Sequence, residues 1–406
     1  MPTSPPIALY ASCAPGLERL VAAELAALGV EAGAVEAGGV AFAGDERALW
    51  RANLWLRTAS RVVVRAASFR ATAFHELERS ARKVPWERFV APGGPVRFRV
   101  TCRKSRLYHS DAVAERLADA VRVRLGEPPA VASAAGDEQD EEHEEHEEQE
   151  GSDAQLFVVR LFHDRCTISA DSSGALLHRR GYRQAVAKAP LRETLAASML
   201  LASDWRGSVP LLDPFCGSGT IVIEAALLAR NVAPGLAAPP DGERTRRYAF
   251  LRWPGFDRNA WEAIVADAER LREQARGATI PTIQGSDRDA GGTAAAVANA
   301  RRAGVADDVE ITTRPLSAVD PPSGPGWLVS NPPYGVRVGE SDRLRNLYAQ
   351  LGKVARRRCP GWSMALLMAG GGLERETGLR FAELLRTANG GIPVRLLAAR
   401  VPEAGA

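Results

Sequence analysis

A short apolar run, a glycine-rich turn and an apolar helix follow one another directly in the second half of the chain. Val209 to Leu212 is the apolar run, residues 213–220 (DPFCGSGT) form the turn, and Ile221 to Ala229 has helical character. In an open parallel sheet, such a turn lies at the carboxyl end of a strand, where ligands bind. This pattern predicts an α/β fold with a Rossmann-like domain. The turn is neither G-x-G-x-x-G nor a P-loop, which disfavours dinucleotides and nucleoside triphosphates.

The turn has the chemistry to hold a cationic ligand. Asp213 comes directly after the apolar run, and a carboxylate there suits S-adenosylmethionine, which carries an ammonium and a sulfonium group. Gly217 and Gly219 remove side chains so that a ligand can approach the backbone, and the helix start offers unpaired N–H groups. We therefore expect S-adenosylmethionine as the cofactor.

A second acidic residue is expected at the same edge of the sheet. Asp287 follows the short strand predicted over Pro281 to Gln284, where a carboxylate can accept hydrogen bonds from both ribose hydroxyls. Asp289 is expected to cap the next helix. The long separation from Asp213 indicates an insertion around Trp253 to Trp261. The residues predicted to bind the cofactor are Asp213, Pro214, Cys216, Gly217, Gly219, Thr220 and Asp287.

The segment Ser330-Asn-Pro-Pro-Tyr-Gly335 follows a third predicted strand and is the candidate catalytic turn. An exocyclic base amine is a poor nucleophile because its lone pair is delocalised into the ring. The side-chain oxygen of Asn331 and the carbonyl of Pro332 can accept its N–H bonds, Pro333 stiffens the turn, and Tyr334 offers a stacking face. The motif predicts direct in-line methyl transfer to nitrogen, with no metal and no covalent intermediate.

The first half of the chain is predicted to fold separately, because 406 residues exceed what one core usually organises. Ile7 to Ser12, Gly16 to Leu28 and Gly39 to Ala43 read as strand, helix and strand. Further strands are expected within residues 53–69, 96–100, 156–162 and 166–170, with a helix over 111–125. This alternation predicts an α+β region before the Rossmann-like domain.

An acidic run conceals the basic character of the remaining chain. Residues 137–150 hold ten carboxylates, so removing them changes the net charge from +3 to +13. A body this basic suits a polyanion, because phosphate neutralisation releases counterions. The run itself is predicted to be a disordered insertion over residues 136–153.

Two basic segments are candidates for contacting such a polyanion. Residues 97–106 (RFRVTCRKSR) place five cations on a strand and its following loop, although a charged sheet edge gives the same pattern. Residues 174–183 (GALLHRRGYR) fit either a nucleic-acid contact or a linker that docks on the next domain through its arginine stems. The residues predicted to contact this polyanion, which charge alone does not identify as RNA or DNA, are Arg97, Arg99, Arg103, Lys104, Arg106, Arg179, Arg180 and Arg183.

Other features bound the location and the chemistry. No stretch approaches the roughly 20 apolar residues of a membrane span, and the first residues lack a signal-peptide pattern, so a cytoplasmic protein with no membrane partner is expected. The five cysteines never form a C-x-x-C pair. They are predicted to be reduced thiols, with no metal site.

The chain resembles bacterial THUMP-domain methyltransferases of the 23S rRNA guanine-N2 type. The resemblance covers nearly the whole length and includes ALYASCAPGLERLVAAEL, HRRGYR, LLDPFCGSGTIVIEAALLARNVAPG and LVSNPPYGVRV. It implies a ferredoxin-like region over residues 1–60, a THUMP RNA-binding domain over 61–184 and a Rossmann-like methyltransferase domain over 185–406. It also implies methylation of the N2 amine of a guanine in 23S rRNA.

The resemblance leaves the adenine contact, the RNA substrate and the catalytic activity itself open. Members of this family usually carry an acidic residue for the cofactor's adenine before the catalytic strand, whereas Arg314-Pro-Leu-Ser317 stands here and Asp320 is a weak substitute. A tRNA guanine-N2 methyltransferase would share the same motifs. A non-catalytic RNA-binding or ribosome-assembly factor on the same scaffold is a further alternative.

Overall fold

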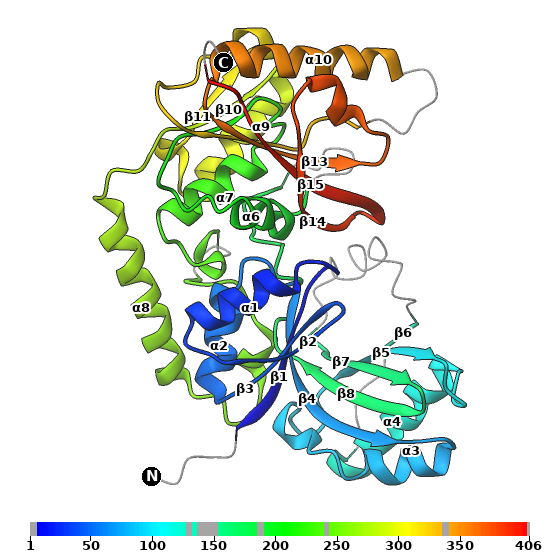
Figure 1. Cartoon of the computed structure of the whole chain (residues 1–406). Helices are drawn as coiled ribbons and strands as arrows, with labels where there is room; N and C mark the ends of the chain where they lie inside the picture. Colours follow the sequence, from blue (N-terminus) through cyan, green and yellow to red (C-terminus); the bar gives the residue numbers. More distant parts are fainter. Residues whose placement is uncertain are drawn as a thin grey trace.

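The computed structural model describes residues 6–126, 132–135, 153–184, 191–238, 243–334 and 341–403. Figure 1 shows two lobes, the N-terminal half of the chain below and the C-terminal half above. The predicted acidic insertion over 136–153 lies outside the described residues except for its last residue. None of the helices within the described ranges is long and apolar enough to cross a bilayer.

The lower lobe is organised around one eight-stranded sheet. Pairing is antiparallel throughout except at β5, which runs parallel to both of its neighbours. In spatial order the strands are β2 (Ala32–Glu36), β3 (Gly39–Gly44), β1 (Ile7–Ser12), β4 (Arg61–Arg70), β8 (Arg165–Asp171), β7 (Gln155–Phe162), β5 (Val96–Arg103) and β6 (Ala132–Ala135). β4 pairs with β1 on one side and β8 on the other. It therefore joins β1, β2 and β3 to β5, β6, β7 and β8 in one sheet.

The helices of this lobe bury their apolar faces against the sheet. They are α1 (Glu18–Ala27), α2 (Glu46–Trp55), α3 (Phe74–Ala81), the 3-10 turn η1 (Trp86–Arg88) and α4 (Ser110–Leu125). Asp45 precedes α2 as its N-cap, and its carboxylate accepts from the backbone N–H of Ala48, as an N-cap should. The expected strands and helices are present. The sequence predictions did not include β2, α2, α3, η1 or β6.

The upper lobe contains a seven-stranded, doubly wound sheet. Its five parallel strands are followed by a hairpin that runs β14 to β15, with β15 antiparallel to both neighbours. In spatial order the strands are β11 (Glu310–Thr313), β10 (Ile283–Asp287), β9 (Leu211–Asp213), β12 (Trp327–Ser330), β13 (Ser363–Ala369), β15 (Ile392–Arg400) and β14 (Ala382–Asn389). This arrangement confirms the predicted mixed α/β class.

Helices cover both faces of this sheet, which explains its apolar central strands. Tyr348 and Leu351 of α10 pack with Leu328 and Met364 on one face, and Val222 of α7 belongs to the core on the other. The helices and 3-10 turns of the second half of the chain, not all of which cover the sheet, are α6 (Glu193–Ala202), α7 (Thr220–Ala229), η3 (Pro234–Leu236), η4 (Ala249–Arg252), α8 (Arg258–Arg276), α9 (Ala290–Arg302), η5 (Ala306–Asp308), η6 (Leu316–Ala318), α10 (Ser341–Arg358) and η7 (Leu373–Thr377).

The predicted insertion between α7 and β10 fastens the two lobes together. Trp50 of α2 packs against Phe250, Phe256 and Trp261, with ring centroids 6.0, 5.4 and 6.4 Å away. α8 runs along the side of both lobes in Figure 1. A second contact involves Gly16, where an added Cβ would lie 1.8 Å from the carbonyl oxygen of Arg386 in β14. The insertion therefore holds the two lobes together through aromatic packing.

Candidate cofactor and catalytic site

Three neighbouring parallel strands end in polar residues at one edge of the upper sheet. β10, β9 and β12 lie side by side and end at Asp287, Asp213 and Ser330. Register places Gly285 of β10 beside Asp213. The two acidic residues and the start of the catalytic turn thus meet at the carboxyl edge, where α/β sheets bind ligands.

The glycine-rich turn is shaped by close backbone packing. Gly219 is the N-cap of α7 in the left-handed region, with φ +85°, and an added Cβ would lie 2.9 Å from Cβ of Ala296 in α9. Gly217 also has positive φ, but a Cβ there would meet nothing within 4 Å. Pro214, Cys216 and Thr220 are buried. The turn is therefore packed from below and open above Gly217, as a cofactor cradle requires.

Asp213 is linked to the catalytic strand by a hydrogen bond. Its side chain is 1% exposed, and its Oδ1 accepts from Ser330 Oγ at 2.5 Å and from the backbone N–H of Phe215 at 3.1 Å. Burial raises the pKa of Asp213 to about 7, against the lowering effect of these two hydrogen bonds. A cationic ligand nearby would favour the carboxylate form. Ser330 was not among the predicted site residues.

Asp287 connects the second strand to the same turn. Its Oδ2 accepts from the backbone N–H of Gly217 at 3.1 Å, and its Oδ1 accepts from that of Asp289 at 3.0 Å. Asp289 accepts from the backbone N–H groups of Gly291 and Gly292, which confirms its predicted capping role. Asp287 is half-buried, and its contact with a ribose stays a prediction.

The candidate catalytic turn contains a buried hydrogen-bond acceptor. Among the described residues no donor reaches Asn331 Oδ1, which is buried, an arrangement that is costly unless a ligand satisfies it. The carbonyl of Pro333 accepts from Tyr348 Oη at 3.2 Å, and Tyr334 Oη accepts from Asn389 Nδ2 at 3.1 Å. Asn389 ends β14, so the hairpin tip reaches the catalytic turn. Neither Tyr348 nor Asn389 carried a sequence signal.

The contact of Asp320 with the cofactor's adenine stays a prediction. This side chain lies 3.8 Å from Arg358 and is 80% exposed. Asp320 lines a pocket together with Ser286 and Arg314. Arg314 follows β11, and its backbone N–H donates to the carbonyl of Asp287 at 2.9 Å.

The prediction that Arg180 contacts RNA is wrong. Arg180 is 3% exposed and donates to the backbone carbonyls of Leu177 and Arg57, so a phosphate cannot reach it. Arg183 donates to the carbonyl of Leu191 and pairs with Glu193 at 3.2 Å. The alternative interpretation, a linker that docks through its arginine stems, describes this segment. Arg179 is half-buried and stays a prediction.

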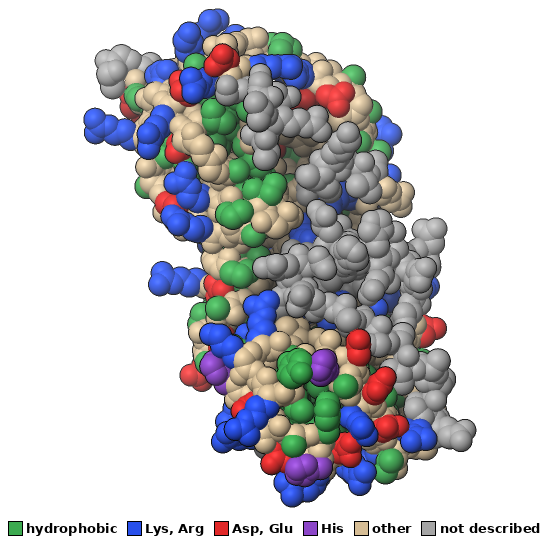
Figure 2. Space-filling model, turned by 90° about the vertical axis from the view of Figure 1, so that its right-hand side faces the viewer, with side chains coloured by type: hydrophobic (Ala, Val, Ile, Leu, Met, Phe, Trp, Pro, Cys, Tyr) green, Lys and Arg blue, Asp and Glu red, His purple; other side chains and the backbone are tan. Residues whose placement is uncertain are grey.

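The other basic segment does reach the surface. Arg103, Lys104 and Arg106 are exposed at the end of β5 and in the loop behind it, whereas Arg97 and Arg99 are half-buried within the strand. β6 pairs with residues 97–100 of β5, so the charged-edge interpretation is wrong for Arg97 and Arg99 and stays open for the exposed cations that follow. Figure 2, which views the molecule from the right-hand side of Figure 1, shows Lys and Arg side chains on that face of both lobes.

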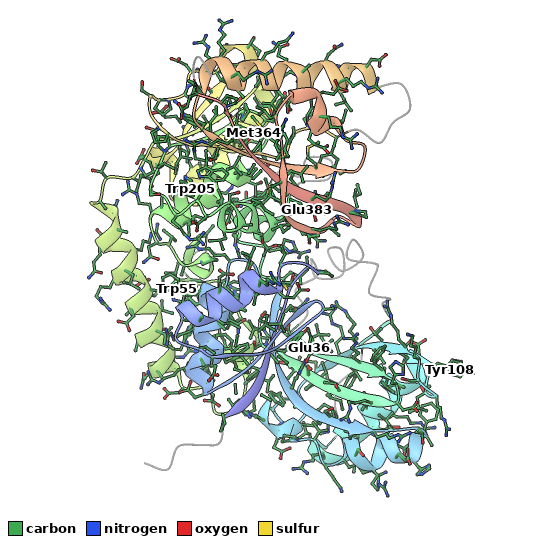
Figure 3. All side chains as sticks on the ribbon, viewed as in Figure 1. Glu36, Trp55, Tyr108, Trp205, Met364 and Glu383 are labelled. Atoms are coloured by element: carbon green, nitrogen blue, oxygen red, sulfur yellow. The ribbon has the colours of Figure 1, made fainter. Side chains whose placement is uncertain are left out.

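Two aromatic side chains lie beside these cations. Tyr108 is 68% exposed and points away from the end of the lower lobe in Figure 3. Phe162 is exposed as well and pairs with Arg103 across the strands β5 and β7. We call Arg103, Lys104, Arg106, Tyr108 and Phe162 the basic-aromatic end. Sequence reasoning named only its cations.

Three families account for most of the chain. An RlmL ferredoxin-like domain matches residues 8–63 and a THUMP domain matches residues 71–171. The RMKL-like methyltransferase domain matches residues 180–393. The "Putative RNA methyltransferase slr0064" of Synechocystis sp. is 33% identical over 96% of this chain and 95% of its own length.

Further relatives of this chain are also methyltransferases or methylases by their names. The "Ribosomal RNA large subunit methyltransferase K/L" of Syntrophotalea carbinolica is 36% identical over 97% of this chain, which spans only 53% of that protein. A solved "possible methylase" from Clostridium difficile 630 has a TM-score of 0.83 and 29% identity, covering 98% of each chain. The crystal structure of SMU.472, "a putative methyltransferase complexed with SAH", has a TM-score of 0.82 and 27% identity, covering 99% of each chain. The chain therefore belongs to the RMKL-like methyltransferase family, with ferredoxin-like and THUMP domains ahead of an S-adenosylmethionine-dependent methyltransferase domain.

Proposed function

We propose that this chain methylates the exocyclic N2 amine of a guanine in large-subunit ribosomal RNA. The observation that carries the proposal is the buried Oδ1 of Asn331, on the turn that follows β12, which accepts no hydrogen bond from any residue in the described part of the chain. A buried acceptor of this kind is satisfied when a ligand brings an N–H donor. An exocyclic amine brings two.

The residues of the turn divide the work of activating that amine. Asn331 Oδ1 and the carbonyl of Pro332 accept its two N–H bonds, which favours a pyramidal nitrogen with a localised lone pair. Tyr334 stacks on the base, and its hydroxyl is fixed by Asn389. When bound, S-adenosylmethionine supplies an electrophilic methyl group on its sulfonium. The C–S bond breaks as the N–C bond forms, and the methylated nitrogen then loses one proton to water.

RNA is favoured as the substrate by the lower lobe. THUMP domains are RNA-binding modules by the resemblance noted above, and the basic-aromatic end offers cations for phosphates and rings for base stacking. A relative that acts on large-subunit rRNA, by its name, matches 97% of this chain. That relative is about twice as long, so its target is a hypothesis for this chain.

Methyl transfer to defined nucleic acids tests the proposal. Purified protein is incubated with radiolabelled S-adenosylmethionine and, separately, with unmodified 23S rRNA, tRNA or duplex DNA, and the nucleosides are identified by mass. We expect N2-methylguanosine from 23S rRNA. N2-methylguanosine from tRNA alone would mean that tRNA, and not 23S rRNA, is the substrate. No transfer to any RNA would refute the proposal.

Asn331→Ala separates catalysis from binding. Removing the acceptor should lower kcat by about 100-fold or more, with the Kd values for RNA and cofactor within a few-fold of the unmodified protein. Asn259→Ala, at an exposed position in α8, is the matched control and should retain full activity. An Asn331→Ala protein that turns over normally but binds RNA poorly would contradict the assigned role.

A further inference from the structure

The HRRGYR segment, residues 178–183, is largely buried although it carries four ionisable side chains and a tyrosine. Tyr182 is fully buried, and its backbone carbonyl accepts from Arg302 Nε at 2.6 Å. Arg302 belongs to the last turn of α9, the helix that packs under the glycine-rich turn. The segment therefore holds one end of a polar path that leads towards the cofactor site.

The path continues through a single asparagine. Arg302 Nη2 donates to Asn299 Oδ1, and Asn299 Nδ2 donates to the carbonyl of Ser218 at 2.9 Å. A guanidinium has donors only, so the amide oxygen of Asn299 must face Arg302 and its NH₂ group must face Ser218. Asn299 is fully buried, and its orientation is thereby fixed.

Ser218 is the middle residue of the glycine-rich turn. Its carbonyl belongs to the peptide that joins Ser218 to Gly219, and the N–H of Gly219 donates to the carbonyl of Cys216 at 2.7 Å. Both sides of this peptide are thus held by hydrogen bonds. Glycines on either side give the turn little conformational preference of its own, so external hydrogen bonds decide its shape.

A second contact links the same segment to the helix that follows the turn. Tyr182 Oη donates to Glu224 Oε1 at 3.0 Å, and Arg180 Nε lies 3.6 Å from the same oxygen. Glu224 is on α7 and is 1% exposed. The segment therefore makes polar contacts with both α7 and α9, the two helices that pack beside the turn.

We propose that Asn299 and Arg302 are positioning residues that hold the glycine-rich turn in its cofactor-binding shape, with the HRRGYR segment as their anchor. The proposal rests on the assignment of that turn to S-adenosylmethionine and not on the RNA target. Cofactor binding measured without RNA therefore tests it separately from the proposed function.

The decisive variant is Asn299→Asp. Aspartate keeps an oxygen for Arg302 but presents an oxygen instead of an N–H to the carbonyl of Ser218. By calorimetry without RNA, we expect the Kd values for S-adenosylmethionine and S-adenosylhomocysteine to rise about tenfold or more. At saturating cofactor, kcat and the KM for RNA should remain within a few-fold of the unmodified protein.

Two further variants complete the test. Arg302→Met keeps the apolar stem and removes the donors, and it should also weaken cofactor binding, which gives a second result should Asn299→Asp fail to fold. Arg301→Ala removes an exposed cation from the same helix turn and should leave the Kd for the cofactor unchanged. Folded Asn299→Asp or Arg302→Met protein with a cofactor Kd within twofold of the unmodified protein would overturn the proposal.

Discussion

Replacing Asp213 with asparagine should stabilise the cofactor-free protein while it weakens cofactor binding. The carboxylate sits 1% exposed at the end of β9, and burial raises its pKa from the ordinary 3.8 to about 7. Asparagine keeps an oxygen for Ser330 Oγ and for the N–H of Phe215 but never ionises. The substitution thus removes the cost of a buried charge without removing its hydrogen bonds.

The magnitude follows from the two pKa values of Asp213. Between pH 3.8 and about 7 the folded protein retains a proton that the unfolded chain releases, so stability is present at low pH and is lost as pH rises through this window. At about 1.4 kcal/mol per pKa unit, the full loss is about 4 kcal/mol. About 2 to 3 kcal/mol of it falls between about pH 5 and about pH 8.

Urea unfolding followed by tryptophan fluorescence measures this effect at the two pH values. The stability advantage of Asp213→Asn should grow by about 2 to 3 kcal/mol from about pH 5 to about pH 8. Asp320→Asn, which replaces an exposed carboxylate in the same lobe, should leave the pH dependence of the unmodified protein intact. An advantage of Asp213→Asn that is the same at both pH values would refute the reasoning.

Two other predictions concern the substrate. Asn389→Leu and Tyr334→Phe both remove the hydrogen bond between Asn389 Nδ2 and Tyr334 Oη, so each should lower kcat/KM for RNA several-fold and the double variant should be no worse than the poorer single one. Fully additive losses would mean that the two residues act independently. Arg103→Glu should weaken RNA binding and reduce the slope of log Kd against log salt by about 1 to 2, as measured by filter binding. An unchanged slope would place Arg103 outside the RNA interface.

Local sequence patterns predicted the parts of the fold that depend on local order. The turn over residues 213–220, the strand ends at Asp287 and Ser330, and the insertion before β10 each leave a mark in consecutive residues, and the structure places them as expected. α2 was not predicted because its buried face is not a simple helical repeat of apolar residues. The face includes the polar Asn53 and contacts a distant segment of the chain.

Contacts between distant residues could not be predicted in the same way. Arg180 resembles a phosphate ligand in sequence, and only the fold brings it to Glu224 and to the carbonyl of Arg57. Ser330 and Asn389 are common polar residues whose roles arise from strands that meet at one edge. The motifs that meet at this edge of the sheet were therefore predictable, whereas the side chains that support them were not.

The strand β4 has a practical consequence for dividing this protein. The ferredoxin-like match ends at residue 63 and the THUMP match begins at residue 71, yet β4 spans Arg61–Arg70 and pairs on both sides. A fragment cut at this boundary would expose unpaired N–H and C=O groups of β1 or β8, which invite aggregation. The ferredoxin-like and THUMP parts should therefore be expressed, and exchanged between proteins, as one piece.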